Sequence, residues 1–220
     1  MMSENWKTRG VMPKRNMASP VGLCSGWYSR GYLPHFEGGE IAQTVTFRLF
    51  DSIPLSLLDR WREELSHRSQ RQVEVGMRVR MEAHLDRGTG SAWMRDERIA
   101  DLVQEALLFF DESRYRLQAW VVMPNHVHVL LTPGAGWELG QILHSWKSFT
   151  SNKCNELLGR CGEFWQKENF DRYVRDERHF YNAVAYIENN PVKAGLCEKP
   201  EDWKWSSATW RKPGSARFRS

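Results

Sequence analysis

Two histidines separated by one residue are the first feature of the sequence that could do chemistry. His126 and His128 stand in the apolar stretch HVHVLL, with Val127 between them. Side chains two positions apart on a strand point to the same face of a sheet, so the two imidazoles would lie together. Such a pair supplies two ligands of a metal site and needs at least one more. The alternative is an ordinary pair with one packed and one exposed histidine.

The kind of metal follows from the donors. Two neutral nitrogens, one oxygen ligand and several open positions suit a phosphate-handling Mg²⁺ or Mn²⁺ better than a closed structural zinc. Placing two histidines on a strand this apolar without a use would also be costly. The pair therefore predicts a divalent-metal site.

Tyr186 is the candidate nucleophile. Together with Asn182 and Asn190 it follows an i, i+4, i+8 spacing, a polar row beside an apolar helical stripe of Phe180, Ala183, Val184 and Ile187. A tyrosine hydroxyl near a metal-bound phosphate can attack it and form a phosphotyrosine ester. Asn190, one turn further on, could give an amide oxygen to the metal. The alternative is that Tyr186 packs against the sheet with its hydroxyl at the rim.

The hydrophobic pattern predicts the elements that must position these residues. We expect strands at Thr44–Phe50, Tyr115–Met123 and His126–Leu131, and a short extended segment at Phe164–Val174. We expect helices over Leu55–Leu85, broken near Val73–Gly76, from an Asp96 cap to Phe110, over Glu138–Leu158, and from Asp176 to a stop before Pro191. This order indicates an α+β protein with helices mainly on one face of an antiparallel sheet.

Composition limits the class of protein. Of the 220 residues, 41% are hydrophobic and 26% charged, which is typical of one globular domain. No apolar run approaches the roughly 20 residues of a membrane helix, and residues 1–25 do not resemble a secretory signal. The cysteines (Cys24, Cys154, Cys161 and Cys197) have no C-x-x-C spacing, so we expect neither zinc nor disulfides and a cytoplasmic setting.

Charge is concentrated at the two ends. The net charge is +4, and basic residues gather before Tyr32 and after Trp203. We expect a flexible basic arm at 1–25, one domain at 26–208 and a basic tail at 209–220. Basic ends can contact phosphates, or they can simply be solvated. Eleven tryptophans add indole faces on which unpaired bases could stack.

At this point the motifs resemble a known family. AWVVMPNHVHVLLTP (Ala119–Pro133), followed by AYIENNPVKAGL (Ala185–Leu196), is similar to the single-tyrosine HUH transposases and, more narrowly, to the REP-associated tyrosine transposases. Three further pieces support the resemblance, namely Gly26–Pro54, FWQKENFDRYVRD (Phe164–Asp176) and the W-x-W-S-S stretch (Trp203–Ser207). The helical region Leu55–Leu85 is hard to match to the family.

The resemblance implies a ferredoxin-like antiparallel sheet, the HUH endonuclease fold. It assigns His126 and His128 to the metal and Tyr186 to the attack, with Asn190 where relatives place a third polar ligand. It also implies a transposase-like endonuclease and strand transferase. Such an enzyme recognises hairpins of repetitive extragenic palindromes in single-stranded DNA and cleaves through a covalent 5′-phosphotyrosine. No nucleotide cofactor is implied, and a monomer is expected ahead of a dimer.

Several residues are candidates for DNA contact. Lys147 stands on the Glu138–Leu158 helix next to Trp146, which could stack a base or belong to the core. Arg172 and Arg175 precede the tyrosine helix, and Lys193 follows it, to touch the scissile phosphate or to cap the helix. Arg30, Tyr32 and His35 lie in an aromatic, glycine-rich loop that could read a tetranucleotide or pack on the sheet edge.

Two other classes of function stay open. The first is a non-catalytic, sequence-specific DNA-binding regulator on the same fold. The second is a nucleotide phosphotransferase with an H-x-H-x-H histidine nucleophile, which Leu130 at the third position argues against.

Overall fold

The centre of the molecule is a four-stranded antiparallel sheet. The computed structural model describes residues 26–29, 34–37 and 39–211. Its sheet has the order β4-β5-β3-β6, formed by Tyr115–Val122, His126–Pro133, Gln43–Arg48 and Phe170–Tyr173. β5 pairs with β4 on one side and β3 on the other, so the strand with both histidines is internal. The predicted α+β class and the antiparallel sheet are confirmed.

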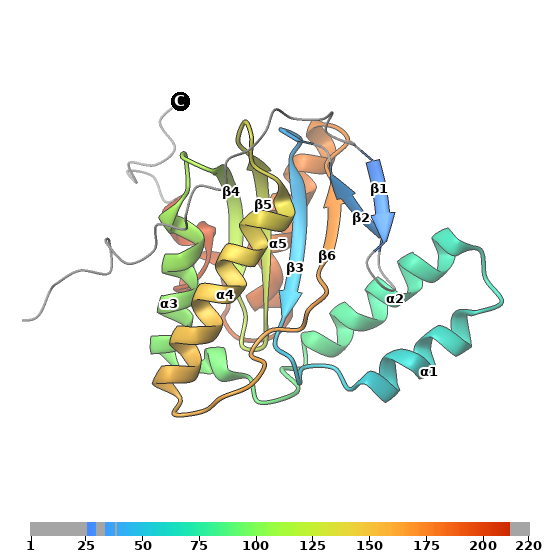
Figure 1. Cartoon of the computed structure of the whole chain (residues 1–220), viewed down its shortest axis with the longest axis horizontal. Coiled ribbons are helices and arrows are strands. Elements are labelled where there is room, and N and C mark those ends of the chain that lie inside the picture. Colours follow the sequence, from blue (N-terminus) through green and yellow to red (C-terminus); the bar gives the residue numbers. More distant parts are fainter. Residues whose placement is uncertain (1–25, 30–33, 38, 212–220) are drawn as a thin grey trace, which may run out of the picture.

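The two faces of the sheet carry different helices. Helices α3 (Glu97–Phe109) and α4 (Leu139–Leu157) build the main core, which takes Val45, Phe47, Val127 and Val129 from the central strands. Helix α5 (Glu177–Lys193) packs on Ala119, Val121 and Leu130, which point the other way. The predicted arrangement, with helices mainly on one face, therefore holds for the main core formed with α3 and α4. The opposite face of the sheet is covered by α5 (Figure 1).

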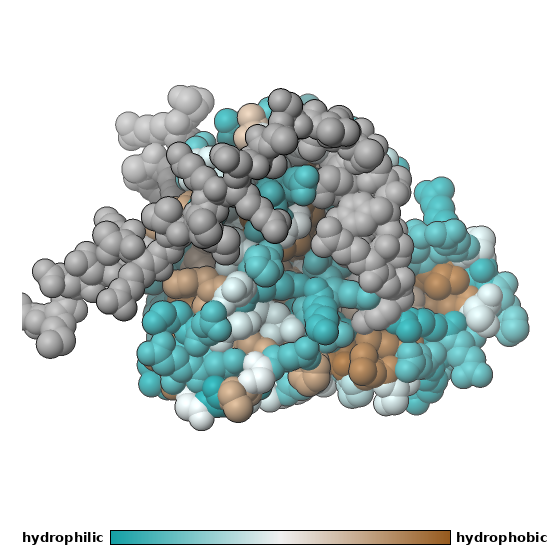
Figure 2. Space-filling model, viewed as in Figure 1, coloured by the Kyte–Doolittle hydropathy of each residue, from teal (hydrophilic) through white to brown (hydrophobic). Residues whose placement is uncertain are grey.

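The Leu55–Leu85 region is a helical hairpin with a core of its own. Helices α1 (Leu55–Leu65) and α2 (Gln70–Leu85) lie side by side at one end of the molecule (Figure 1). Their shared apolar cluster consists of Ile53, Leu58, Leu65, Met77, Met81 and Leu85, with Phe170 of the sheet packed against it. The space-filling view shows an apolar patch where this hairpin joins the body (Figure 2).

The predicted break near Val73–Gly76 is wrong, because the chain turns earlier. Ser69 caps α2 through a capping box with Gln72, whose Oε1 accepts from the Ser69 amide at 3.1 Å. Gly76 lies inside α2, where a Cβ would stand 3.0 Å from Leu65 Cδ1. The glycine therefore permits close approach of the two helices.

The predicted stop before Pro191 is also wrong. Helix α5 runs on to Lys193 and ends in a Schellman motif, in which Leu196 N donates to Pro191 O at 2.9 Å and Gly195 N to Val192 O at 3.0 Å. Gly195 adopts φ +70°, which glycine tolerates without cost. Pro191 is accommodated in the last turns, so Tyr186, Asn190 and Lys193 share one helix.

The segment after α5 covers the free edge of β4. Val122 N donates to Trp205 O at 2.9 Å, and Trp203 Nε1 donates to Val122 O at 2.9 Å. A short 3-10 helix, Ser207–Trp210, continues this cover. The remaining described strands, β1 (Gly26–Ser29) and β2 (Pro34–Glu37), form an antiparallel pair.

The basic arm 1–25 and residues 212–220 of the basic tail lie outside the described residues. Within the described part, none of the helices has the length and apolar character that a membrane crossing requires. Cys154, Cys161 and Cys197 are free thiols.

Candidate metal and nucleophile site

The two histidines meet at their Nε2 atoms, which lie 3.0 Å apart. Both side chains are buried on the α5 face of the sheet, in register with Arg48 and Thr46 of β3. Each ring is held by a neighbour at its other nitrogen. Asn125 Oδ1 lies 2.7 Å from His126 Nδ1, and Thr46 Oγ1 lies 2.6 Å from His128 Nδ1. Such partners fix the orientation of imidazoles that bind metals.

The protonation of the rings leaves the facing nitrogen of His126 able to bind a cation. Burial lowers the pKa of both histidines, helped by the charge of Lys193, and that of His128 falls to about 3. Both rings are therefore neutral near pH 7. Asn125 Nδ2 donates to Thr89 O at 2.9 Å, so Asn125 Oδ1 accepts from His126 Nδ1 and the His126 Nε2 lone pair stays free.

Asn190 has the free acceptor that a third ligand would need. The side chain is fully buried, and its Nδ2 donates to Tyr186 O at 3.0 Å. Its Oδ1 is buried with no hydrogen-bond partner among the described residues. An orphaned amide oxygen is costly unless something outside the protein binds it.

The donor set fits a weakly held divalent ion. Among the described residues no group of three or more His, Cys, Asp or Glu side chains could hold a metal. Two imidazole nitrogens and an amide oxygen would leave positions open for water and for phosphate oxygens. This is the pattern expected for Mg²⁺ or Mn²⁺ shared with a substrate.

Tyr186 lies beside the histidine pair. Its ring centroid is 5.6 Å from that of His128, in an edge-on arrangement, and 37% of the residue is exposed. The side chains of Glu82 and Asn190 interact with its hydroxyl. Burial raises the pKa of this phenol, and the nearby Glu82 carboxylate raises it further. Attack by this oxygen therefore requires a group that removes its proton.

Helix α2 completes the site from the other side. Burial raises the pKa of the Glu82 carboxyl, which faces the phenol. Lys193 Nζ forms a 2.7 Å salt bridge with Asp86 Oδ2 and lies 5.8 Å from the Tyr186 ring centroid. Carboxylates of α2 and of its C-cap residue thus stand against both Tyr186 and Lys193 of α5.

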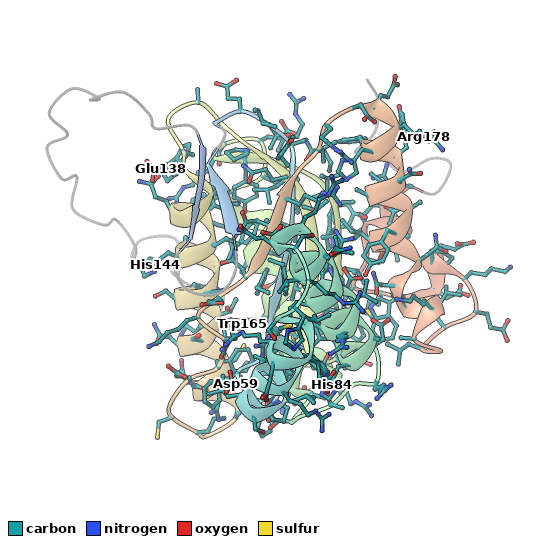
Figure 3. All side chains as sticks on the ribbon, turned by 90° about the vertical axis from the view of Figure 1, so that its right-hand side faces the viewer. Asp59, His84, Glu138, His144, Trp165 and Arg178 are labelled. Atoms are coloured by element: carbon teal, nitrogen blue, oxygen red, sulfur yellow. The ribbon has the colours of Figure 1, made fainter. Side chains whose placement is uncertain are left out.

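A groove of about 750 Å³ opens between α2, β6 and α5. His128 and Tyr186 lie along it, and so do Arg172 and Arg175, two of the residues expected to bind DNA. Figure 3 views the molecule from this side and shows α2, on which His84 is labelled, in front of the sheet with α5 beside it. The structure therefore brings together His126, His128, Tyr186, Asn190, Arg172, Arg175 and Lys193.

Other predicted DNA contacts are not part of this assembly. Lys147 lies on α4, where its Nζ donates to the carbonyls of Gln166 and Lys167, each at 3.0 Å. Burial lowers the pKa of Lys147 to about 8. Trp146 is buried and belongs to the main core. Arg30 and Tyr32 lie outside the described residues, and of His35 only its place in β2 is described.

Sequence reasoning missed the contributions of Thr46, Asn125 and α2. A usable signal existed in α2, where Glu74, Arg78 and Glu82 follow an i, i+4, i+8 spacing. The apolar Met77, Met81 and Leu85 follow the same spacing on another face. The charged row is therefore the face that the helix can offer to a partner.

Comparisons with known proteins find sequences and a fold that are similar to those of this chain. Residues 92–190 match the model of the IS200-like transposases. A REP-associated tyrosine transposase of Escherichia coli is 27% identical over 109 residues, and a putative one of Haemophilus influenzae is 27% identical over 100. The resemblance to REP-associated tyrosine transposases is thereby confirmed.

Each of these matches covers only part of the two chains that are compared. The alignments cover 48% and 39% of this chain, and 62% and 54% of the two relatives, so less than two thirds of either relative is matched. A solved REP-associated tyrosine transposase bound to a REP hairpin aligns over 79% of both chains at 17% identity, with a TM-score of 0.51, and supports the fold. The transposase match includes both histidines, Tyr186 and Asn190, whereas β3, α1 and α2 precede it.

Proposed function

We propose that this protein is a metal-dependent endonuclease and strand transferase that cuts single-stranded DNA with Tyr186. The observation that carries the proposal is the meeting of the His126–His128 pair and the Tyr186 ring within one chain, 5.6 Å from ring to ring at His128. His126, His128 and Asn190 would bind one divalent ion, Mg²⁺ or Mn²⁺. When bound, that ion would withdraw charge from the scissile phosphate and orient it.

The residues of the chain would then perform the transfer. The Tyr186 hydroxyl attacks the phosphorus, a new phosphorus–oxygen bond forms, and the bond to the 3′ oxygen of the preceding nucleotide breaks. The phenol proton passes to the Glu82 carboxylate, whose raised pKa makes it a ready acceptor. The 3′ oxygen leaves with the electron pair of the broken bond and takes up a proton from water, which gives a 3′ hydroxyl. The 5′-phosphotyrosine conserves the energy needed to rejoin the strand.

The proposed substrate is a hairpin of a repetitive extragenic palindrome. It is supported by the similar fold of the relative solved with a REP hairpin. We also propose that one copy of the chain suffices, because Tyr186 and His128 already meet within a single chain. No nucleotide cofactor enters the scheme.

The test is formation of a covalent protein–DNA adduct. The probe is a pool of 3′-labelled single-stranded oligonucleotides, each with a hairpin stem beside a randomised tetranucleotide, mixed with protein and Mg²⁺ or Mn²⁺. A labelled band that survives denaturing electrophoresis is expected from wild type and from Tyr181→Phe, which removes an exposed tyrosine of the same helix. The band should be lost in Tyr186→Phe.

Two outcomes would oppose the proposal. An adduct that persists in Tyr186→Phe would assign the attack to another residue. Tight hairpin binding without an adduct under either metal would favour the non-catalytic DNA-binding regulator.

A further inference from the structure

Helix α2 lines the groove with charged residues. Arg71, Glu74, Arg78 and Glu82 all face it, one helical turn or so apart. On the opposite wall stand Arg172 of β6 and Arg175, which precedes α5. The same groove reaches His128 and Tyr186. A ligand lying in it would therefore touch α2 and the proposed reaction centre at once.

The arginines of the groove repel one another. The pKa of Arg172 is lowered first by burial and then by the charges of Arg78, Arg175 and Arg71. The pKa of His179, at the same place, is also lowered, first by burial and then by the charges of Arg172, Arg175 and Arg78, while Asp176 opposes the shift. Like charges gathered in a partly buried groove destabilise the free protein, and an anion in the groove would relieve that cost.

Carboxylates compensate these charges only in part, since three acidic residues (Glu74, Glu82 and Asp171) line the groove beside the four arginines. Among the described residues, Arg71, Arg172 and Arg175 form no salt bridge, and Arg78 reaches Glu82 only at 3.8 Å. Glu82 is engaged with Tyr186 as well. Four guanidinium groups from two walls exceed what one phosphate needs, so the groove suits several phosphates in a row.

We propose that α2 is the second wall of the single-strand binding groove. Arg71 and Arg78 bind phosphates of the strand from one side while Arg172 and Arg175 bind them from the other, which leads the strand to Tyr186. This deepens the proposed function and rests on it for the identity of the ligand. It also gives a role to a helix that precedes the segment matched by the transposase family.

The test separates binding from cleavage. Affinity for a fluorescein-labelled single-stranded oligonucleotide is measured by anisotropy over a range of salt, without metal and in the Tyr186→Phe background. The variant is Arg71→Gln with Arg78→Gln. The control is Arg60→Gln with Arg68→Gln, which removes the same charge from exposed positions of the α1–α2 hairpin that do not line the groove.

The expected result is a loss of affinity of at least tenfold in the groove variant and less than twofold in the control. The salt slope should fall by about 1.4, since each phosphate contact to a single strand contributes about 0.7. Arg71→Gln alone, at an exposed helix start, should show about half of the slope change without any effect on folding. Equal effects in the groove variant and the control would overturn the proposal.

The two proposals fail differently. If the groove variant binds as tightly as its parent while wild type still forms the Tyr186 adduct, the role of α2 is refuted and the nuclease stands. If wild type forms no adduct but the groove variant loses binding, the nuclease fails and the groove stands.

Discussion

The reactive atoms of the site are each held by a neighbour that leaves them free to react. His126 and His128 bind Asn125 and Thr46 through Nδ1, so their Nε2 atoms face one another. The Tyr186 hydroxyl faces a carboxylate, and the Asn190 amide oxygen faces no partner among the described residues. This arrangement is costly to fold, and binding of the proposed metal ion and phosphate would offset that cost.

Replacement of Glu82 tests the proton acceptor. Glu82→Gln keeps the size of the side chain and removes its charge, so the Tyr186 proton has no carboxylate to accept it. We expect adduct formation to slow by roughly 10²- to 10⁴-fold, the usual contribution of a positioned acid or base, with little change in DNA affinity. Single-turnover kinetics measure this, with Glu74→Gln on the same groove as the control. An unchanged rate would remove Glu82 from the reaction.

At the scale of single residues, the sequence pointed to the residues at the centre of the candidate site and missed the residues that hold them in place. Strand alternation and helical spacing are local rules, and together with the resemblance to the transposases they pointed to His126, His128 and the Tyr186–Asn190 row, which lie near one another in the structure. Thr46 and Glu82 reach the same place through contacts 82 and 104 positions away in the chain, at His128 and Tyr186 respectively. Pairing at such distances depends on the register of the sheet and the packing of α2, which no local pattern specifies.

At the scale of elements, the α1–α2 hairpin has an apolar core of its own, and we expect it to unfold as a separate unit. Its apolar cluster is distinct from the two clusters of the sheet. The site nevertheless depends on it, since α2 brings Glu82 to Tyr186. A change in the hairpin core should therefore disturb the site without unfolding the sheet.

Leu65, which belongs to the hairpin core and is 3% exposed, allows a specific test of this expectation. Leu65→Ala should cost about 2–5 kcal/mol within the hairpin. Hydrogen exchange followed by mass spectrometry should show faster exchange across residues 55–85 and unchanged protection in β4 and β5. Val79→Ala, at a 54% exposed position of α2, is the control. Equal loss of protection in the sheet would show that hairpin and sheet fold as one unit.

The sequence located most elements, misjudged two boundaries, and was interpreted as a loop where β1 and β2 form an antiparallel pair. Hydrophobic periodicity gave the sheet strands and α3, α4 and α5. The α1–α2 turn was misplaced because Gly76 was read as a break, whereas it serves the close contact with Leu65. The end of α5 was misplaced because Pro191 was given more weight than Gly195, which forms the actual C-terminal motif. Both errors arose because the backbone preference of one residue, Gly76 or Pro191, was considered without the packing around it.

At the scale of the whole molecule, the buried histidine pair links stability to pH. Both pKa values are depressed from the ordinary 6.5, to about 3 for His128. Below pH 6.5 the unfolded chain takes up protons that the folded chain refuses. The free energy of unfolding should therefore be highest above pH 6.5 and fall as the pH drops toward 3.

Urea unfolding in a chelator between pH 7 and 5 measures this. His128→Gln should reduce the pH dependence of the unfolding free energy by up to about 1.4 kcal/mol per pH unit. His67→Gln, an exposed histidine outside the site, is the control and should behave as wild type. If the unfolding free energy of His128→Gln changed with pH as steeply as that of wild type, His128 would not be held neutral in the folded protein.

In the proposed reaction one tyrosine, placed by α5 beside the histidine pair, becomes covalently bonded to DNA. The most direct measurement is peptide mapping of the purified adduct formed with Mn²⁺, after nuclease trimming, by tandem mass spectrometry. We expect the residual nucleotide on Tyr186. A nucleotide on any other residue, the neighbouring Tyr181 included, would contradict it.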